Sequence, residues 1–512
     1  MIVPAHVNLK YWFYPTGNTP AVNLFRQLPA LDASHPTEEV EVLLLACGDP
    51  RSLLFSLWCV DGHTRNSILL ALIIDEGGDR TSQASWDLFY HLYVPQSSLS
   101  VLQTEVAKLL SVSESPEAWN SSPYGRFLRF LSWDTLREVR QIWLRYAQTW
   151  HFTAEELQQY ETRARAGMED NFKKYENTRV LHGVRSAGAM WSQAAATMSH
   201  AFARYWASGV VAGNAADVRR LGQQGRVNPM FATSSAPDGG FAVHYGTEPL
   251  LGFNLAEAFE SVGNGNNNTV NHEALDRSVR LAKTQIQAWS TSLAHFVRAD
   301  RIRIRLFCGD AVRLCQELER PPPAEKGTTF PSAYTKQWSF RPLVLDGEAW
   351  PHSQSQDEHP RFDVVDTSNL IDHVGAMTVL ASAAPLLSRK PTSVLYTESL
   401  LLASEDVTST LPQLLSSDTT TFSLAMGLTP IGHVIGYTTD EVGNEGFMSA
   451  IAPKAGRGQY RIRVSWGFPG LGDLSTPPPD PQCAMAPVEF DPDQLAAYFF
   501  DIYKKMFDSQ LS

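Results

Sequence analysis

Three apolar runs in this chain share one form: each is short, rich in Val, Leu, Ile or Phe, and ends on a small polar group that contains aspartate. The runs are Val40–Asp49 (VEVLLLACGD), Arg303–Asp310 (RIRLFCGD) and Phe362–Asn369 (FDVVDTSN). Such a run, bounded by Gly or Asp, is typical of a strand buried on both faces, as in a parallel sheet covered by helices. Ligands of these sheets bind beyond the carboxyl ends of the strands, so a functional site is expected at the three ends.

The rest of the chain places these runs in an α/β fold. A helix is expected after each run, and residues 84–225 are expected to be mostly helical. Late antiparallel strands are expected at 433–438 and 460–466. We therefore predict a Rossmann-like, methyltransferase-type sheet with a large helical insertion. The expected segments are 1–83 and 241–475 for the sheet core, 84–240 for the insertion, and 476–512 for a C-terminal helix.

Composition narrows the possible partners. The net charge of −12 argues against a general binder of nucleic acid or of anionic membranes, because both require basic surface. The five cysteines include no C-x-x-C pair, so neither a cysteine zinc site nor a disulfide framework is expected. No charged segment followed by an apolar stretch begins the chain, and the longest apolar runs are too short to span a bilayer. These features predict a cytoplasmic protein without nucleic-acid or membrane partners, and they leave protein partners open.

The first strand end carries four candidate cofactor-binding residues. Gly48 allows close backbone approach, and Asp49 lies at the positive end of the next helix. Cys47 and Arg51 flank them. The dinucleotide fingerprint G-x-G-x-x-G is absent, which disfavours NAD and FAD. The alternative is that Asp49 only caps the helix, with Pro50 at its first position.

The other two ends offer a second set. Gly309-Asp310 opens a helix, and in methyltransferase-like sheets an acid at this place accepts a hydrogen bond from an adenine amino group; helix capping is the alternative. At the third end, Asp366, Asn369 and His373 are candidate catalytic residues, and Ser368 is a candidate cofactor ligand. Such a group binds the amino-acid part of a cofactor or moves a proton. An Asx-type turn with a capped helix is the alternative.

Distinctive motifs also give a family resemblance. They are YWFYPTGNTP at 11–20, LLLACGDPRSLLFSL at 43–57, HYGTEPL at 244–250, CGDA at 308–311 and FDVVDTSNLIDHVG at 362–375. They resemble a fungal family that carries the DUF4470 domain, a domain that also begins the axonemal dynein assembly factor 3 proteins. The resemblance covers nearly the whole chain. It implies a methyltransferase-like Rossmann core without an established reaction.

One departure from that family concerns the second strand. Relatives have an extra strand ending in Cys-Asp, whereas here Cys59-Val60-Asp61 runs almost directly into His63–Asn66, so this strand is shortened or absent. The resemblance implies Asp61 as the ligand of the cofactor ribose, and the shortening puts that role in question. Two hypotheses follow: an S-adenosylmethionine-dependent methyltransferase with an unknown acceptor, or a non-catalytic scaffold or assembly factor.

Overall fold

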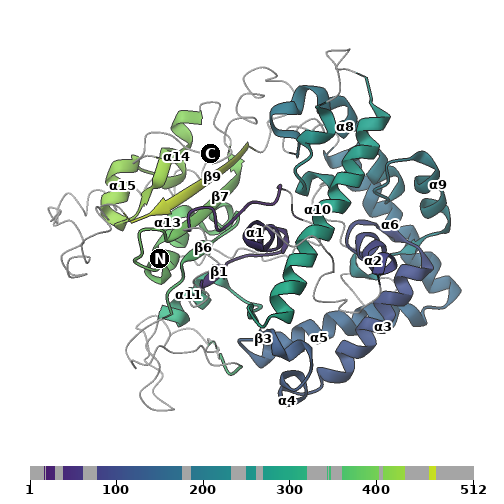
Figure 1. Cartoon of the computed structure of the whole chain (residues 1–512), viewed down its shortest axis with the longest axis horizontal. Helices are drawn as coiled ribbons and strands as arrows, with labels where there is room; N and C mark the ends of the chain where they lie inside the picture. The colour runs from purple at the N-terminus through teal and green to yellow at the C-terminus, as the bar shows by residue number, and fades with distance from the viewer. Residues whose placement is uncertain are drawn as a thin grey trace, which may run out of the picture.

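The computed structural model describes residues 17, 19–28, 39–61, 78–175, 186–231, 249–260, 269–319, 343, 345–347, 360–402, 407–432 and 460–468. These residues form a helical body and a sheet unit (Figure 1), with helix α1 (Arg51–Asp61) between the two. The predicted strand at 433–438, the predicted C-terminal helix at 476–512 and the segment 244–248 lie outside the described residues.

The sheet unit is built on a mixed five-stranded sheet. Its strands, in spatial order, are β1 (Val42–Leu44), β6 (Val364–Asp366), β7 (Val394–Leu402), β9 (Tyr460–Gly467) and β8 (Thr429–Pro430). Strands β1, β6 and β7 run parallel, and β9 runs antiparallel to both β7 and β8. The first and third apolar runs are therefore adjacent parallel strands, as expected, and the late strand at 460–466 is antiparallel, as expected. The fold is mixed α/β.

The two faces of this sheet are covered differently. Side chains alternate between the faces, so Val365 and Leu395 pack in one cluster while Val364 and Val394 pack in another. The first face is covered by α11 (Ala311–Glu319), α12 (Ile371–Val374), α13 (Ala376–Ala383), η8 (Ala384–Leu386), α14 (Val407–Leu415) and α15 (Thr419–Met426). The second face is covered by residues 19–28, and α1 lies above them.

The helical body holds the largest hydrophobic core. Its α-helices are α2 (Gly78–Tyr90), α3 (Gln96–Val112), α4 (Pro116–Asn120), α5 (Trp133–Gln148), α6 (Ala154–Tyr175), α8 (Trp191–Ser208), α9 (Ala215–Gln224) and α10 (His272–Arg298). Short 3-10 turns η1 (Tyr124–Arg126), η2 (Thr149–His151), η4 (Gly188–Met190), η5 (Pro229–Phe231), η6 (Pro249–Gly252) and η7 (Ala256–Phe259) connect them. Strands β2 (Tyr93–Val94) and β4 (Arg226–Val227) pair antiparallel within this body.

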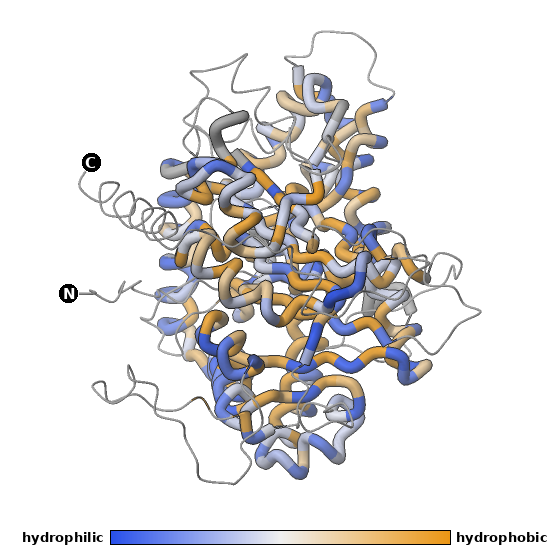
Figure 2. The backbone as a smooth tube through the Cα atoms, turned by 90° about the vertical axis from the view of Figure 1, so that its left-hand side faces the viewer, coloured by the Kyte–Doolittle hydropathy of each residue, from blue (hydrophilic) through white to orange (hydrophobic). Residues whose placement is uncertain are grey.

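Helix α10 is the long helix of this core and packs along α1. Trp289, which its sequence pattern predicts to be buried, is 1% exposed and stacks on Phe253 at 5.5 Å between ring centroids. Hydrophobic and hydrophilic residues alternate along many of the helices (Figure 2), which is the pattern of helices with one face in a core.

Local sequence explains where several helices begin. Thr153 and Glu156 form a capping box before α6, as the pattern Thr-x-x-Glu predicts: the Thr153 N–H donates to Glu156 Oε2 at 2.7 Å, and the Glu156 N–H donates to Thr153 Oγ1 at 3.3 Å. Ser132 caps α5 by accepting a hydrogen bond from the Thr135 N–H at 3.2 Å. These contacts span three residues, which is why the sequence predicts them.

The second apolar run differs from the expectation of one common sheet. Its strand, β5 (Ile304–Leu306), pairs in parallel with β3 (Leu128–Phe130) in a separate two-stranded sheet. The partner strand comes from the predicted helical insertion, and no pattern in the sequence indicates that pairing. The charge of Arg305 in β5 acts on Glu41, which just precedes β1 of the larger sheet.

Candidate functional site

The ends of the first and third runs meet at one edge of the five-stranded sheet. In the register of β1 and β6, Leu44 lies opposite Asp366, and the Leu45 N–H donates to the Asp366 carbonyl oxygen at 2.8 Å. Parallel strands place their carboxyl ends on the same side, so the residues that follow both strands share this edge. It is the candidate site.

Asp49, at the end of β1, is held by the chain itself. Its Oδ1 accepts the Arg51 N–H at 3.0 Å, so the predicted capping role is confirmed. Its Oδ2 accepts the Gly17 N–H at 2.6 Å and pairs with the Arg51 guanidinium at 2.5 Å. Arg51 Nη2 in turn donates to the Gly17 carbonyl oxygen at 2.9 Å. Both carboxylate oxygens of Asp49 are therefore engaged within the protein.

Arg51, predicted as a cofactor ligand, is a buried link between the sheet edge and the helical body. It is 3% exposed, and its guanidinium lies 5.6 Å from the centre of the Phe253 ring. A Cβ atom on Gly252 would lie 0.8 Å from Arg51 Nη1, so a residue larger than glycine at 252 would displace the guanidinium. The pair of Arg51 and Asp49 thus joins β1 to the body.

The Cys47 thiol lies near both strand ends. Desolvation, and then the charges of Asp49 and Asp366, raise the pKa of Cys47 to about 12. Cys47 itself is exposed, and the two nearby carboxylates disfavour its thiolate form. Its neighbour Gly48 is exposed. Cys47, Asp49 and Asp366 are three predicted site residues that the fold brings together.

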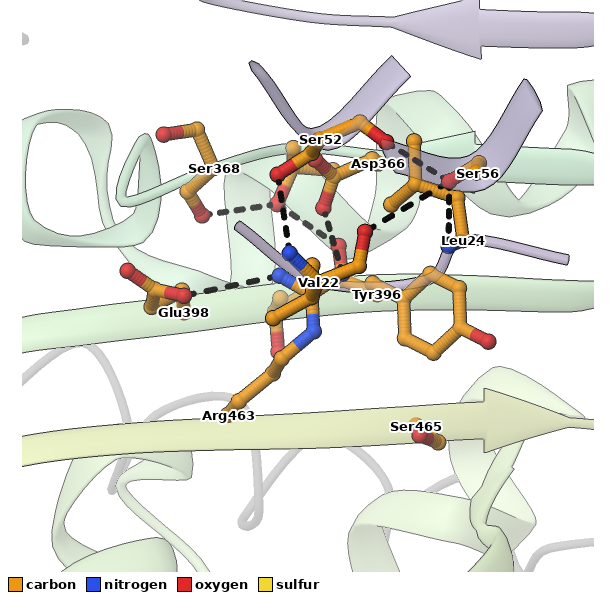
Figure 3. A network of polar contacts seen from close by, with 12 residues as sticks. Val22, Leu24, Ser52, Ser56, Asp366, Ser368, Tyr396, Glu398, Arg463 and Ser465 are labelled. Atoms are coloured by element: carbon orange, nitrogen blue, oxygen red, sulfur yellow. Dashed lines mark hydrogen bonds and ion pairs between the residues drawn. The ribbon is translucent and has the colours of Figure 1, made fainter. Parts of the chain in front are cut away.

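Asp366 belongs to a buried group of four charged side chains, which we call the ionic cluster: Asp366, Glu398, Arg461 and Arg463. Asp366 Oδ1 lies 3.1 Å from Arg463 Nη2, and the side chains are 15% and 7% exposed. Glu398 Oε2 lies 3.4 Å from Arg463 Nη1 and 2.9 Å from Arg461 Nη2. Figure 3 shows Asp366, Glu398 and Arg463 turned toward one another above the strands. The two negative and two positive charges balance, which lowers the free-energy cost of burying each one.

Opposing influences act on the pKa of Asp366, and their net effect is to raise it. Burial is the largest influence and raises the pKa of Asp366, and the Glu398 carboxylate adds to it, while Arg463 opposes both. Arg463 also lies over Tyr396, 4.4 Å from the ring centre. Ser368, two residues after Asp366, has a left-handed backbone with φ of +48°. In this tight turn, the Ser368 carbonyl oxygen accepts a hydrogen bond from the Glu398 N–H at 2.9 Å.

Two of the predicted catalytic residues lie nearer to solvent. Asn369 Nδ2 and His373 Nε2 are 3.5 Å apart, and His373 is exposed. Their helix is anchored by Asp372, which accepts the Ser399 hydroxyl at 2.5 Å and the Leu400 N–H at 2.7 Å. Among the predicted catalytic residues, His373 is therefore the exposed one, and its described polar contact is with Asn369.

The remaining predicted residues do not join this group. Asp310 caps α11 by accepting the Arg313 N–H at 2.8 Å, so the capping alternative is confirmed for it. No hydrogen bond or ion pair within the described part of the chain connects Asp310 to Asp49 or Asp366. Gly309 precedes it at the exposed end of β5. Asp61 is the last residue of helix α1, not of a strand.

Sequence reasoning missed the other members of the ionic cluster. Arg461 and Arg463 alternate with Ile462 and Val464 in β9, and Glu398 lies between Thr397 and Ser399 in β7, so charged residues within the strands were a signal. Charged residues on the buried face of a strand require partners on the neighbouring strands.

Comparison with known families gives one match. A family model described as "Domain of unknown function (DUF4470)" matches residues 15–64. In the structure, these residues contain Gly17, β1, the Asp49–Arg51 pair and α1. No curated protein and no solved structure matches the chain. No helix among the described residues is long and apolar enough to cross a membrane.

Proposed function

We propose that this chain is a non-catalytic scaffold that uses a methyltransferase-like fold to bind protein partners in the cytoplasm. The observation that supports it is the internal use of the predicted cofactor ligands. Asp49 is engaged by Gly17 and Arg51, and Asp366 is paired with Arg463. An acid with its oxygens already paired offers little to the hydroxyl or ammonium groups of a cofactor, because a competing ligand must first break buried contacts.

S-adenosylmethionine fits these residues poorly for two further reasons. The ribose of such a cofactor needs an acidic side chain at the end of a second strand, and Asp61 ends a helix instead. The adenine needs an acceptor near the same edge, and Asp310 caps a helix that follows a strand of another sheet. We therefore derive no methyl-transfer step for this chain.

The methyltransferase-like ancestry remains part of the proposal. It is supported by three parallel strands followed by an antiparallel β9 inserted beside β7, a sheet pattern consistent with the resemblance. The match at residues 15–64 supports a relationship to proteins with the DUF4470 domain.

The test is titration calorimetry of the full chain with S-adenosylmethionine and S-adenosylhomocysteine, together with a thermal-shift measurement. We expect no saturable heat and no rise in Tm. Binding to the native state would raise Tm, with about 2.7 kcal/mol of stabilisation at one hundred times Kd. Saturable micromolar binding would overturn the proposal.

A cofactor site is the second candidate, because Cys47, Asn369 and His373 gather at the edge where β1 and β6 end. The double variant Asn369→Ala, His373→Ala distinguishes the scaffold function from the cofactor site. A scaffold keeps the proteins that co-purify with it in fixed stoichiometry when these side chains are removed. A cofactor site loses its ligand in the same variant.

A further inference from the structure

We propose that residues 19–28, which we call the strap, form a cover over one face of the sheet that opens separately from the rest of the fold, with Asp49 and Arg51 as its latch. This goes beyond the proposed function, since opening would change which face of the sheet is accessible whatever binds there.

The strap lies between α1 and the sheet. Leu24 is fully buried and packs with Val364, Val394 and Tyr396 of strands β6 and β7. On its other side, the Leu24 N–H donates to Ser56 Oγ of α1 at 2.8 Å. In Figure 3, Val22 and Leu24 run between the helix that carries Ser52 and Ser56 and the strands below. The strap therefore separates α1 from the sheet.

The strap is held by side chains more than by a backbone ladder. The Val22 N–H donates to Ser52 Oγ at 3.4 Å. Ser56 Oγ donates to the Ser52 carbonyl oxygen of its own helix at 2.6 Å and lies 3.4 Å from the Val22 carbonyl oxygen. One backbone bond reaches the helical body, from the Ala21 N–H to the Gly252 carbonyl oxygen at 3.2 Å. A segment without a strand or helix ladder opens locally at a lower free energy than the strands beneath it.

The face under the strap is partly polar. Arg26 Nη2 donates to Ser465 Oγ at 3.0 Å, and its guanidinium lies 5.6 Å from the centre of the Tyr396 ring. Arg463, a member of the ionic cluster, lies against the same ring. Opening the strap would uncover Tyr396 and the adjoining side of the cluster. It would convert an internal face into a surface with charged and aromatic groups.

The latch is the contact that ends the strap on its N-terminal side. Asp49 Oδ2 accepts the Gly17 N–H while Arg51 Nη2 donates to the Gly17 carbonyl oxygen, so Gly17 is held from both directions. Because Arg51 is packed against Phe253, the latch also ties the strap to the helical body. Loss of the Asp49 carboxylate would free this end without removing any residue of the strap.

Hydrogen–deuterium exchange of the full chain tests the proposal. We expect Ser56→Ala to raise the exchange rate of peptides covering the strap by about three- to tenfold, the effect of one lost hydrogen bond. Asp49→Ala, which removes the latch carboxylate, should also raise the exchange rate of these peptides. Exchange in α5 and β7 should stay at the wild-type rate. Ser100→Ala is the matched control, because Ser100 donates only to the Gln96 carbonyl oxygen in its own helix.

Two results would overturn the proposal that the strap opens separately. One is unchanged exchange of residues 19–28 in Ser56→Ala. The other is a rise that occurs equally in the strap, β7 and α10, which would show that the segment opens only when the whole protein unfolds. If Asp49→Ala does not fold, Ser56→Ala still decides the question, because alanine is well tolerated inside a helix.

Discussion

The end of β6 and the end of β5 look alike in sequence and differ in the structure. Each is an apolar run followed by an aspartate. Asp366 has only 15% of its side chain exposed and is ion-paired with Arg463, whereas Asp310 is exposed and caps the helix that follows it. Strand β6 lies between β1 and β7, while β5 has β3 as its described partner. At these two strand ends, the aspartate whose strand has a neighbour on each side is ion-paired, and the aspartate whose strand has one described neighbour is a surface cap.

The largest effect is expected from breaking the ionic cluster. Arg463→Ala would leave Asp366 without its cation and weaken the pairing of Glu398, so we expect a loss of about 3–5 kcal/mol in the free energy of unfolding, measured by urea denaturation. The control is Arg137→Ala, which removes an exposed pair with Asp134 and should cost at most about 1 kcal/mol. Equal losses in both variants would contradict a buried cluster.

A smaller effect is expected at the other strand end. Asp310→Ala removes the cap of α11 and should cost about 1 kcal/mol, measured in the same way. Asp310→Asn should restore most of it, because the asparagine oxygen also accepts a backbone N–H. Asp418→Ala is a matched comparison, since Asp418 caps α15 through the Thr421 N–H at 2.9 Å. A loss as large as that of Arg463→Ala would mean that the two strand ends are not different.

The smallest effect concerns pH. The pKa of Asp366 is raised by burial above its ordinary value of 3.8, so the folded state binds its proton more tightly than the unfolded state. The stability from this group is present below pH 3.8 and is lost as pH rises through the folded pKa. Compared with Asp366→Asn, the wild type should therefore lose free energy of unfolding as pH rises from 3.8 through the folded pKa. Unfolding curves of both proteins at several pH values check this. If the wild type instead gained stability relative to Asp366→Asn as pH rises, the prediction would be wrong.

Asp87 offers an internal contrast for the same measurement. Burial acts to raise its pKa, but hydrogen bonds from His91, Ser98 and Gln83 outweigh it and lower the pKa of Asp87 below 3.8. Its stabilising contribution is therefore present above pH 3.8 and is lost as pH falls through the folded pKa. Asp87→Asn should show the opposite dependence on pH to Asp366→Asn.

Features of short sequence range were predictable. The capping box of Thr153 and Glu156 and the caps formed by Asp49 and Asp310 join residues no more than three apart. The burial of Trp289 follows from the periodicity of one helix. The adjacency of the first and third apolar runs was also within reach, since both have the pattern of central parallel strands.

The ionic cluster and the strap were not predictable in the same way. Glu398 meets Arg463 because of the antiparallel register of β7 and β9, and Leu24 meets Val364 because a segment that precedes β1 folds back over β6. Likewise, β5 of the second apolar run pairs with β3, a strand that no sequence pattern indicates as its partner.

The sequence by itself determined the strands of the three apolar runs, several helix starts and the aspartates that follow those runs, because these depend on contacts within a few residues and on alternation along one element. Only the tertiary structure decided which ends meet and which charges are paired. The physical reason is that a buried charge takes its partner from whichever strand lies beside it, and that neighbour is set by sheet order across hundreds of residues.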